Sequence, residues 1–164
     1  MKIRVFIVED EYIHLEAIKI ELSEAGFELA GECRDADSAF ERIKAACPDV
    51  VLVDIALPGK NNGITLAEKI NRALNIPHIF TTSFSEEDVV LEAISTNPAG
   101  YLHKPVDRVN LAAAIRLAVS REVKDERTEE KPRTEPGVVF TRVGDKLLRV
   151  NIDDLLAIRA DGEN

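Results

Sequence analysis

The stretch Val50-Val51-Leu52-Val53-Asp54 joins four aliphatic side chains to a terminal carboxylate. An unbroken aliphatic run of this kind is typical of a strand that is buried on both faces of a parallel sheet. Similar runs at 3–8 and 77–81 are also followed by polar residues. The sequence therefore predicts several buried parallel strands, each with a polar side chain at its carboxyl end.

Segments with helical periodicity lie between these runs. Apolar residues recur every three or four positions at 13–25, 36–46, 64–74, 86–96 and 108–121, and shorter strands are predicted at 27–33 and 100–103. Strands that alternate with helices form parallel units whose helices cover both faces of the sheet. We therefore expect an α/β fold over residues 1–121, with a doubly wound five-stranded parallel sheet.

The last part of the chain has a different character. Residues 122–137 are highly charged and contain two prolines but no apolar periodicity, which indicates a linker. Short segments at 138–142, 146–151 and 155–160 predict strands, the first two joined by a Gly-Asp turn. Because residues 138–164 are too few to bury a core, we expect a short β-rich C-terminal extension that begins a second domain.

The composition argues against several classes of protein. A net charge of −9 provides no basic surface of the kind that binds nucleic acid. Cys33 and Cys47 lack the spacing of a zinc site or a disulfide framework, so we predict that both are core thiols. His78 and His103 lie in predicted strands, where we expect them to be packed rather than to act as ligands. The apolar run near the N-terminus is too short for a signal peptide or a membrane span. We expect a cytoplasmic protein without membrane contact.

Polar residues follow the predicted strands at points that should meet in space. Glu9 and Asp10 follow the first strand, Asp54 ends the third, Thr82 follows the fourth and Lys104 the fifth. The carboxyl ends of parallel strands face one crevice, where ligands bind. Adjacent carboxylates repel one another, and a hard cation such as Mg²⁺ offsets that cost. Taken singly, these residues have ordinary alternatives as helix-capping acids, a strand threonine and a surface lysine.

Asp54 and Lys104 suggest a specific chemistry. A carboxylate can act as a nucleophile and form an acyl phosphate when a metal ion and a cationic side chain organise the incoming phosphoryl group. Lys104 precedes Pro105, and a cis bond between them would turn the chain and aim the ammonium group into the crevice.

The spacing of these residues resembles that of the receiver domain of bacterial two-component response regulators. Asp54 lies 44 residues after Asp10, Thr82 lies 28 residues further on, and Lys104 follows after another 22. The resemblance covers residues 2–121 and implies a flavodoxin-like sheet with strand order 2-1-3-4-5. Residues 138–164 resemble, with a less specific motif, the opening strands of a LytTR-type DNA-binding domain.

The first resemblance implies a phosphorylation switch. Asp54 is then the phosphoacceptor for a partner histidine kinase, and Lys104 and Thr82 bind phosphoryl oxygens. Tyr101, three residues before Lys104, matches the aromatic switch position of the family and is expected to rotate inward when Thr82 moves toward the phosphate. The output is a shift between two populations of the domain.

The same resemblance implies a magnesium site. Asp10, Asp54 and the backbone carbonyl of Ala56 would hold the Mg²⁺ ion, and Glu9 would act through a water molecule. The sequence departs from the family at two positions that flank the phosphoryl group, two residues after Asp54 and two after Thr82. Ala56 and Phe84 lie there, and neither has a polar group that could orient a water molecule. The loop between Pro58 and Gly63 is one residue longer than the common form.

Resemblance to the family also implies macromolecular partners. We expect a phosphorylation-dependent homodimer through the last two helices and the fifth strand of the receiver. Its face combines charged side chains with apolar ones: Asp88, Glu92, Arg108 and Arg116 with Val89, Ala93 and Leu111. Regulation of transcription would require DNA binding by a C-terminal part beyond these residues.

Two other functions remain open. The chain could be a stand-alone receiver that acts by protein contact, or a phosphatase-like enzyme that uses an aspartyl phosphate. The short site without a cap, and the absence of a second acid two residues after Asp54, where this sequence has Ala56, argue against the second function. We therefore expect a protein that is not an enzyme, with at most slow autophosphorylation and autodephosphorylation.

Overall fold

A computed structural model describes residues 2–59, 62–83, 92–125, 138–143 and 146–151 of the chain. The chain divides into two compact units, Met1–Arg127 and Thr128–Asn164. The first unit contains all the polar strand-end residues discussed above, and the second contains one antiparallel strand pair.

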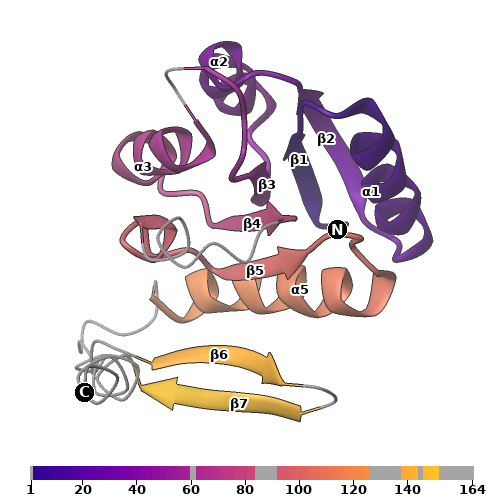
Figure 1. The fold of residues 1–164 in the computed structure, drawn as a ribbon. Coiled ribbons are helices and arrows are strands. Elements are labelled where there is room, and N and C mark those ends of the chain that lie inside the picture. Colours follow the sequence, from indigo (N-terminus) through magenta and orange to yellow (C-terminus); the bar gives the residue numbers. More distant parts are fainter. Residues whose placement is uncertain (1, 60–61, 84–91, 126–137, 144–145, 152–164) are drawn as a thin grey trace, which may run out of the picture. The chain divides into compact units, whose positions relative to one another are not determined.

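Five strands form the sheet of the first unit: β1 (Arg4–Val8), β2 (Glu28–Cys33), β3 (Val50–Asp54), β4 (His78–Thr82) and β5 (Gly100–His103). They lie in the order β2-β1-β3-β4-β5, and every neighbouring pair is parallel (Figure 1). The predicted α/β fold and strand order are confirmed. The direction of winding reverses between β1 and β3, and the carboxyl ends of the strands at such a reversal are where open α/β sheets bind ligands.

The helices of the first unit are α1 (Tyr12–Glu24), α2 (Ala36–Ala46), α3 (Gly63–Ala73) and α5 (Arg108–Asp125). Polar side chains fix three of the helix starts: Asp35, Asn62 and Asp107 each accept a hydrogen bond from a backbone N–H of the first turn. Of the helix predicted at 86–96, residues 92–94 are helical, and most of the remainder lies outside the described residues.

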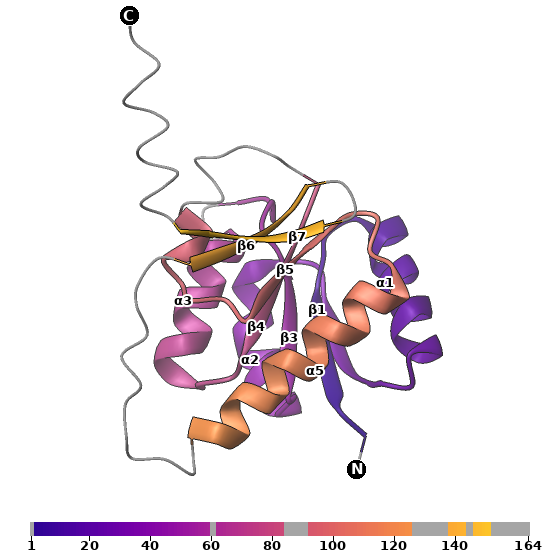
Figure 2. The same ribbon diagram turned by 90° about the horizontal axis from the view of Figure 1, so that it is seen from below.

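The helices cover both faces of the sheet, as the two views show (Figures 1 and 2). Helices α2 and α3 pack on one face around Phe6, Val51 and Phe80, and helices α1 and α5 pack on the other around Val5 and Leu52. Successive strand residues therefore alternate between two buried layers, and each fully buried large aliphatic side chain contributes about 1.5 to 3 kcal/mol. The carboxyl edge of the sheet therefore lies between two packed layers of side chains.

Two predictions of buried side chains are wrong. Cys47 is exposed, because it lies in a left-handed turn directly after α2 with a φ of 46°. His103 is exposed at the end of β5, which is an edge strand with a single neighbour. Cys33 and His78 are buried as predicted, and both cysteines are free thiols.

The second unit contains a hairpin of β6 (Val138–Val143) and β7 (Lys146–Asn151). Two of the three strands predicted after residue 137 are thus present, and the third, at 155–160, lies outside the described residues. Throughout the described ranges, no helix is both long enough and apolar enough to cross a bilayer.

Candidate functional site

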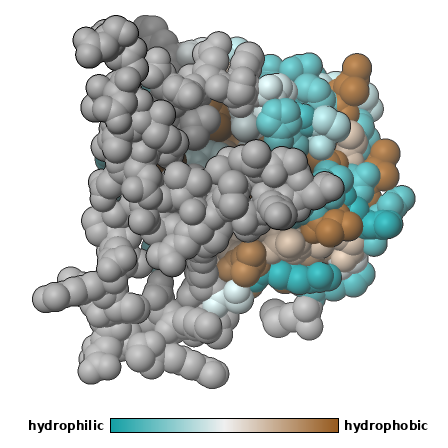
Figure 3. Space-filling view, turned by 60° about the horizontal axis from the view of Figure 1, so that its bottom comes forward, coloured by the Kyte–Doolittle hydropathy of each residue, from teal (hydrophilic) through white to brown (hydrophobic). Residues whose placement is uncertain are grey.

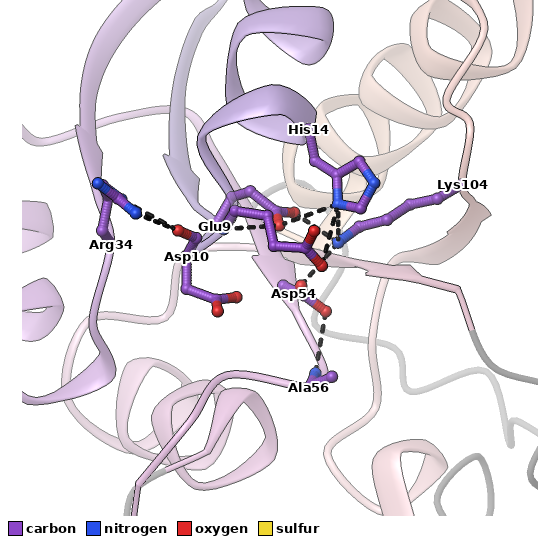
Figure 4. A network of polar contacts seen from close by, with 8 residues as sticks. Glu9, Asp10, His14, Arg34, Asp54, Ala56 and Lys104 are labelled. Carbon is purple, nitrogen blue, oxygen red and sulfur yellow. Dashed lines mark hydrogen bonds and ion pairs between the residues drawn. The ribbon is translucent and has the colours of Figure 1, made fainter.

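The carboxyl edge of the sheet brings the predicted site residues together. Glu9 and Asp10 directly follow β1, Asp54 is the last residue of β3, Thr82 is the last residue of β4, and Lys104 directly follows β5. Backbone hydrogen bonds fix these ends, since the Lys104 N–H donates to the carbonyl of Thr82 at 2.8 Å. Figure 4 shows the charged side chains of this edge turned toward one another.

Lys104 is the centre of the cluster. Its Nζ lies 2.6 Å from Asp54 Oδ2 and 2.7 Å from Glu9 Oε2. The three side chains are almost fully buried, with exposed fractions of 6% for Lys104, 4% for Asp54 and 0% for Glu9. The Lys104–Pro105 peptide bond is cis. One ammonium group therefore faces two carboxylates in a medium with little water.

Burial and charge act against each other in this cluster. Burial raises the pKa of Glu9, although its contact with Lys104 partly offsets the effect. Burial alone would lower the pKa of Lys104, but the hydrogen bonds to Asp54 and Glu9 outweigh it, so the pKa of Lys104 is raised. Lys104 therefore stays charged at neutral pH. If Glu9 and Asp54 are both ionised, their two negative charges exceed the single positive charge of Lys104, and the cluster attracts a cation.

The acidic cluster can hold a metal ion. Glu9, Asp10 and Asp54 each offer a carboxylate oxygen, and these oxygens all lie within 4.8 Å of one another. Asp10 is half-buried, so water can reach the cluster from its side. Hard divalent cations select oxygen-only donor sets of this kind.

Backbone contacts on both sides hold Asp54 in place. Its Oδ1 accepts a hydrogen bond from the backbone N–H of Ala56 at 2.9 Å, so that both carboxylate oxygens have a partner. At the start of α3, a Cβ atom on Gly63 would lie 1.9 Å from the backbone oxygen of Asp54. Only glycine permits this approach, and the helix thereby packs directly on the end of β3.

Tyr101 lies inward, beside the core. Its ring packs on Phe80 with the ring centroids 5.7 Å apart. The Tyr101 hydroxyl is buried and finds no hydrogen-bond partner among the residues that the structure describes. Burial also raises the pKa of this hydroxyl. Thr82, on the neighbouring strand β4, is buried too.

Sequence reasoning missed two residues at this edge. His14, in the first turn of α1, approaches Lys104, with 3.4 Å between Nδ1 and Nζ. Arg34 directly follows β2 and donates to the backbone oxygen of Asp10 from Nε at 3.0 Å and from Nη2 at 2.7 Å (Figure 4). Their positions in the sequence could have revealed both residues. Arg34 comes directly after a predicted strand, and His14 lies four residues after Asp10.

Residues 5–116 match the protein family described as the response regulator receiver domain. The chain belongs to this family. Among solved structures, the signal receiver domain of a modulated diguanylate cyclase from Desulfovibrio desulfuricans G20 is similar, with 30% identity and a TM-score of 0.73. That similarity covers 76% of this chain and 99% of the other. The receiver-domain fold therefore accounts for the first unit.

Curated relatives of this receiver-domain protein are transcriptional regulatory proteins. PdtaR of Mycobacterium tuberculosis is 36% identical over 118 residues, which cover 72% of this chain and 57% of PdtaR. CseB of Streptomyces coelicolor is 31% identical over 159 residues, which cover 95% of this chain and 66% of CseB. The chain thus spans less than two thirds of the length of each of these relatives.

The predicted composition of the dimer face needs a correction. Ala93 and Leu111 are fully buried in the core and cannot form an interface. Arg108 pairs with Glu24 of α1, with 3.0 Å between Nη1 and Oε2, and Arg116 lies over the ring of Phe27. Asp88 and Val89, which we also assigned to this face, lie outside the described residues. Helical periodicity alone had placed Leu111 on both a buried stripe and an exposed face.

Among the α5 side chains that the structure describes, the large apolar ones that are exposed are instead Val109 and Leu117. On the described surface in Figure 3, apolar side chains lie in separate spots among polar ones. A dimer through this part of the receiver stays a prediction, with a different set of contacts from those we expected.

Proposed function

We propose that the chain is a phosphorylation switch in which Asp54 accepts a phosphoryl group from a partner histidine kinase. The observation that carries this proposal is the contact of the Lys104 ammonium group with Asp54 Oδ2 at 2.6 Å, inside a cluster of acids. A carboxylate oxygen attacks phosphorus as the bond to the donor breaks, and the product is an acyl phosphate. Lys104 lies where it can bind an oxygen of the transferred group, and the Thr82 hydroxyl binds another.

Mg²⁺ fits the oxygen donors at this edge. Asp10, Asp54 and the backbone carbonyl of Ala56 would hold the ion, and Glu9 would act through water because its own Oε2 is paired with Lys104. When bound, Mg²⁺ neutralises charge on the phosphoryl oxygens. The residues of the chain then keep Asp54 oriented through the N–H of Ala56 and the ammonium group of Lys104.

Tyr101 supplies the readout in this proposal. Among the described residues the Tyr101 hydroxyl has no hydrogen-bond partner, and a buried hydroxyl left unpaired costs about 1 to 3 kcal/mol. An outward position in which the hydroxyl reaches water therefore competes with the inward one. Movement of Thr82 toward the phosphoryl group changes the space available to the Tyr101 ring and shifts the balance. The surface around β5 and α5 changes as a result.

We further propose that the output is transcription. In this proposal residues 138–164 begin a DNA-binding domain of the LytTR type, and phosphorylation favours a homodimer through β5 and the last two helices of the receiver. Two observations support it: residues after 137 form the hairpin β6–β7, and the similarity to the transcriptional regulatory protein CseB extends over 95% of the chain. The protein acts by binding rather than as an enzyme.

Mass spectrometry of the unmodified protein tests the proposed chemistry. The chain is incubated with acetyl phosphate, with Mg²⁺ in one sample and EDTA in the other, and then digested. We expect one phosphoryl group, only in the Mg²⁺ sample, on the peptide that contains Asp54. A phosphoryl group on another peptide, or equal labelling in EDTA, would refute the proposal.

A further inference from the structure

His14 has an unusual set of neighbours. Its Nδ1 atom lies 3.5 Å from Glu9 Oε1, 3.5 Å from Glu11 Oε1 and 3.4 Å from Lys104 Nζ. One third of the His14 side chain is exposed, whereas Glu9 is fully buried. Figure 4 shows the imidazole ring turned toward these charged groups.

No protonation state of His14 satisfies all three neighbours. A single nitrogen presents either a proton, which suits the two carboxylates, or a lone pair, which suits the ammonium group. The three distances also exceed those of good hydrogen bonds, which run from about 2.7 to 3.2 Å. Glu9 Oε1 already accepts a long hydrogen bond from the Glu11 backbone N–H at 3.3 Å, and a cation between Nδ1 and the two carboxylate oxygens would bind all three ligand atoms together.

The spacing of the three ligand atoms suits a small transition-metal ion. Zinc binds histidine nitrogen and carboxylate oxygen at about 2.0 to 2.2 Å in tetrahedral sites, which places neighbouring ligand atoms about 3.3 to 3.6 Å apart. Nδ1 lies 3.5 Å from each carboxylate oxygen, and all three atoms are within 4.8 Å of one another. Glu11 and His14 are three residues apart at the start of α1 and so share one side of the helix.

The charge of this edge favours the binding of a cation. Four carboxylates, those of Glu9, Asp10, Glu11 and Asp54, lie in the two overlapping clusters. Two cationic side chains lie beside them: Lys104 contacts Asp54 and Glu9, and Arg34 donates to the backbone oxygen of Asp10. If all four acids are ionised, an excess of two negative charges is left, so a cation has an electrostatic reason to bind, and the ligand atoms decide which cluster it occupies.

We propose that Glu9, Glu11 and His14 form a second metal site, for a transition-metal cation such as Zn²⁺. An imidazole nitrogen favours such ions, whereas Mg²⁺ prefers oxygen ligands, so the two sites at this edge differ in selectivity. The two sites share Glu9. The transition-metal ion would bind the lone pair of His14 Nδ1, which Lys104 Nζ approaches at 3.4 Å in this structure. Lys104 keeps its contacts with Asp54 and Glu9 Oε2. This proposal does not depend on Asp54 being the phosphoacceptor.

Calorimetric titration of the full chain with Zn²⁺ alone, and separately with Mg²⁺ alone, tests the proposal. All proteins carry Cys47→Ser, because the exposed thiol of Cys47 could itself bind zinc. We expect His14→Gln to weaken Zn²⁺ binding by at least about tenfold and to leave Mg²⁺ binding unchanged. Retained Mg²⁺ binding also shows that the variant is folded.

Two further variants complete the titration. His103→Gln removes another exposed imidazole, close to Lys104 in sequence, and should change neither titration. Asp10→Asn should weaken Mg²⁺ binding and keep the zinc site. In ¹⁵N NMR of the parent protein, Zn²⁺ should shift the Nδ1 resonance of His14 far more than its Nε2 resonance. Equal zinc affinity of His14→Gln and its parent, or joint loss of zinc and magnesium binding in Asp10→Asn, would overturn the proposal.

Discussion

Two lysines of this receiver domain each bridge two carboxylates, with nearly the same geometry. Lys19 Nζ on α1 lies 2.8 Å from Glu16 and 2.9 Å from Glu32, and Lys104 Nζ lies 2.6 Å from Asp54 and 2.7 Å from Glu9. Side-chain exposure separates them: 28% for Lys19 against 6% for Lys104.

The surroundings, rather than the distances, make one of these clusters a candidate site. The carboxylate partners of Lys19 are more than one third exposed, so water screens their charges. The partners of Lys104 are buried, and there the same charges interact strongly with one another and with any bound ion. The pKa of both lysines is raised, so a raised pKa alone does not identify the functional cluster.

The largest effect should come from removing the buried ammonium group. Lys104→Met leaves Glu9 and Asp54 as neighbouring buried carboxylates, and we expect the free energy of unfolding at pH 7 to fall by about 3 to 5 kcal/mol. Denaturant titration measures this change. Lys19→Met is the matched control, and its effect should be small and should fade in high salt. Similar losses in the two variants would contradict the comparison.

A buried titratable group that contacts a hydroxyl, His78, sharpens the same contrast. His78 is buried beneath Phe80, its Nε2 lies 2.9 Å from Thr96 Oγ1, and burial lowers its pKa from 6.5 to about 4. The unfolded chain therefore binds more protons than the folded one between these values. The contribution of His78 to the free energy of unfolding is therefore fully present above about pH 6.5 and is lost as the pH is lowered, with a loss of about 3 kcal/mol at pH 4.

Denaturant titrations at pH 7 and pH 4 check this expectation for the parent protein and for His78→Gln. The raised pKa of Glu9 acts in the opposite direction, since it favours the folded state at low pH, but it is common to both proteins and cancels in the difference. The loss on acidification should be smaller in His78→Gln. Parallel pH profiles would show that His78 does not titrate in this way.

A smaller effect, of opposite sign, is expected from Asp10. Its half-buried carboxylate adds negative charge beside Glu9 and Asp54. Without divalent cations, Asp10→Asn should raise the free energy of unfolding by roughly 1 kcal/mol, because one repulsive charge is removed. Excess Mg²⁺ should stabilise the parent protein more than the variant. A variant that is less stable than the parent in EDTA would argue against mutual repulsion of these acids.

The sequence was sufficient to predict the sheet and the residues at its edge. Runs such as Val50–Val53 are unambiguous, because a strand buried on both faces needs an apolar residue at every position. The convergence of Asp54 and Lys104 followed from the shared direction of parallel strands. Both inferences rest on topology and need no knowledge of how individual side chains pack.

Other features depend on packing that the sequence does not display. His14 lies on the first turn of a helix, and only the entry angle of α1 turns it toward Lys104. The burial of Leu111 and the pairing of Arg108 with Glu24 follow from how α5 lies against α1 and the sheet. The exposure of Cys47 depends on one left-handed residue after α2. The first two features depend on the relative placement of helices and strands, and the third depends on a local backbone conformation.

The most direct test of the account compares two aspartates at opposite ends of β3. Asp54 is the last residue of the strand and is buried, whereas Asp49 immediately precedes the strand and is exposed. Both are changed to Asn, and phosphoryl uptake from acetyl phosphate with Mg²⁺ is measured by intact mass, with circular dichroism as the check on folding. We predict that Asp54→Asn abolishes uptake, because an amide is not a nucleophile, and that Asp49→Asn takes up the phosphoryl group like the parent. Undiminished uptake by a folded Asp54→Asn variant would contradict the central claim.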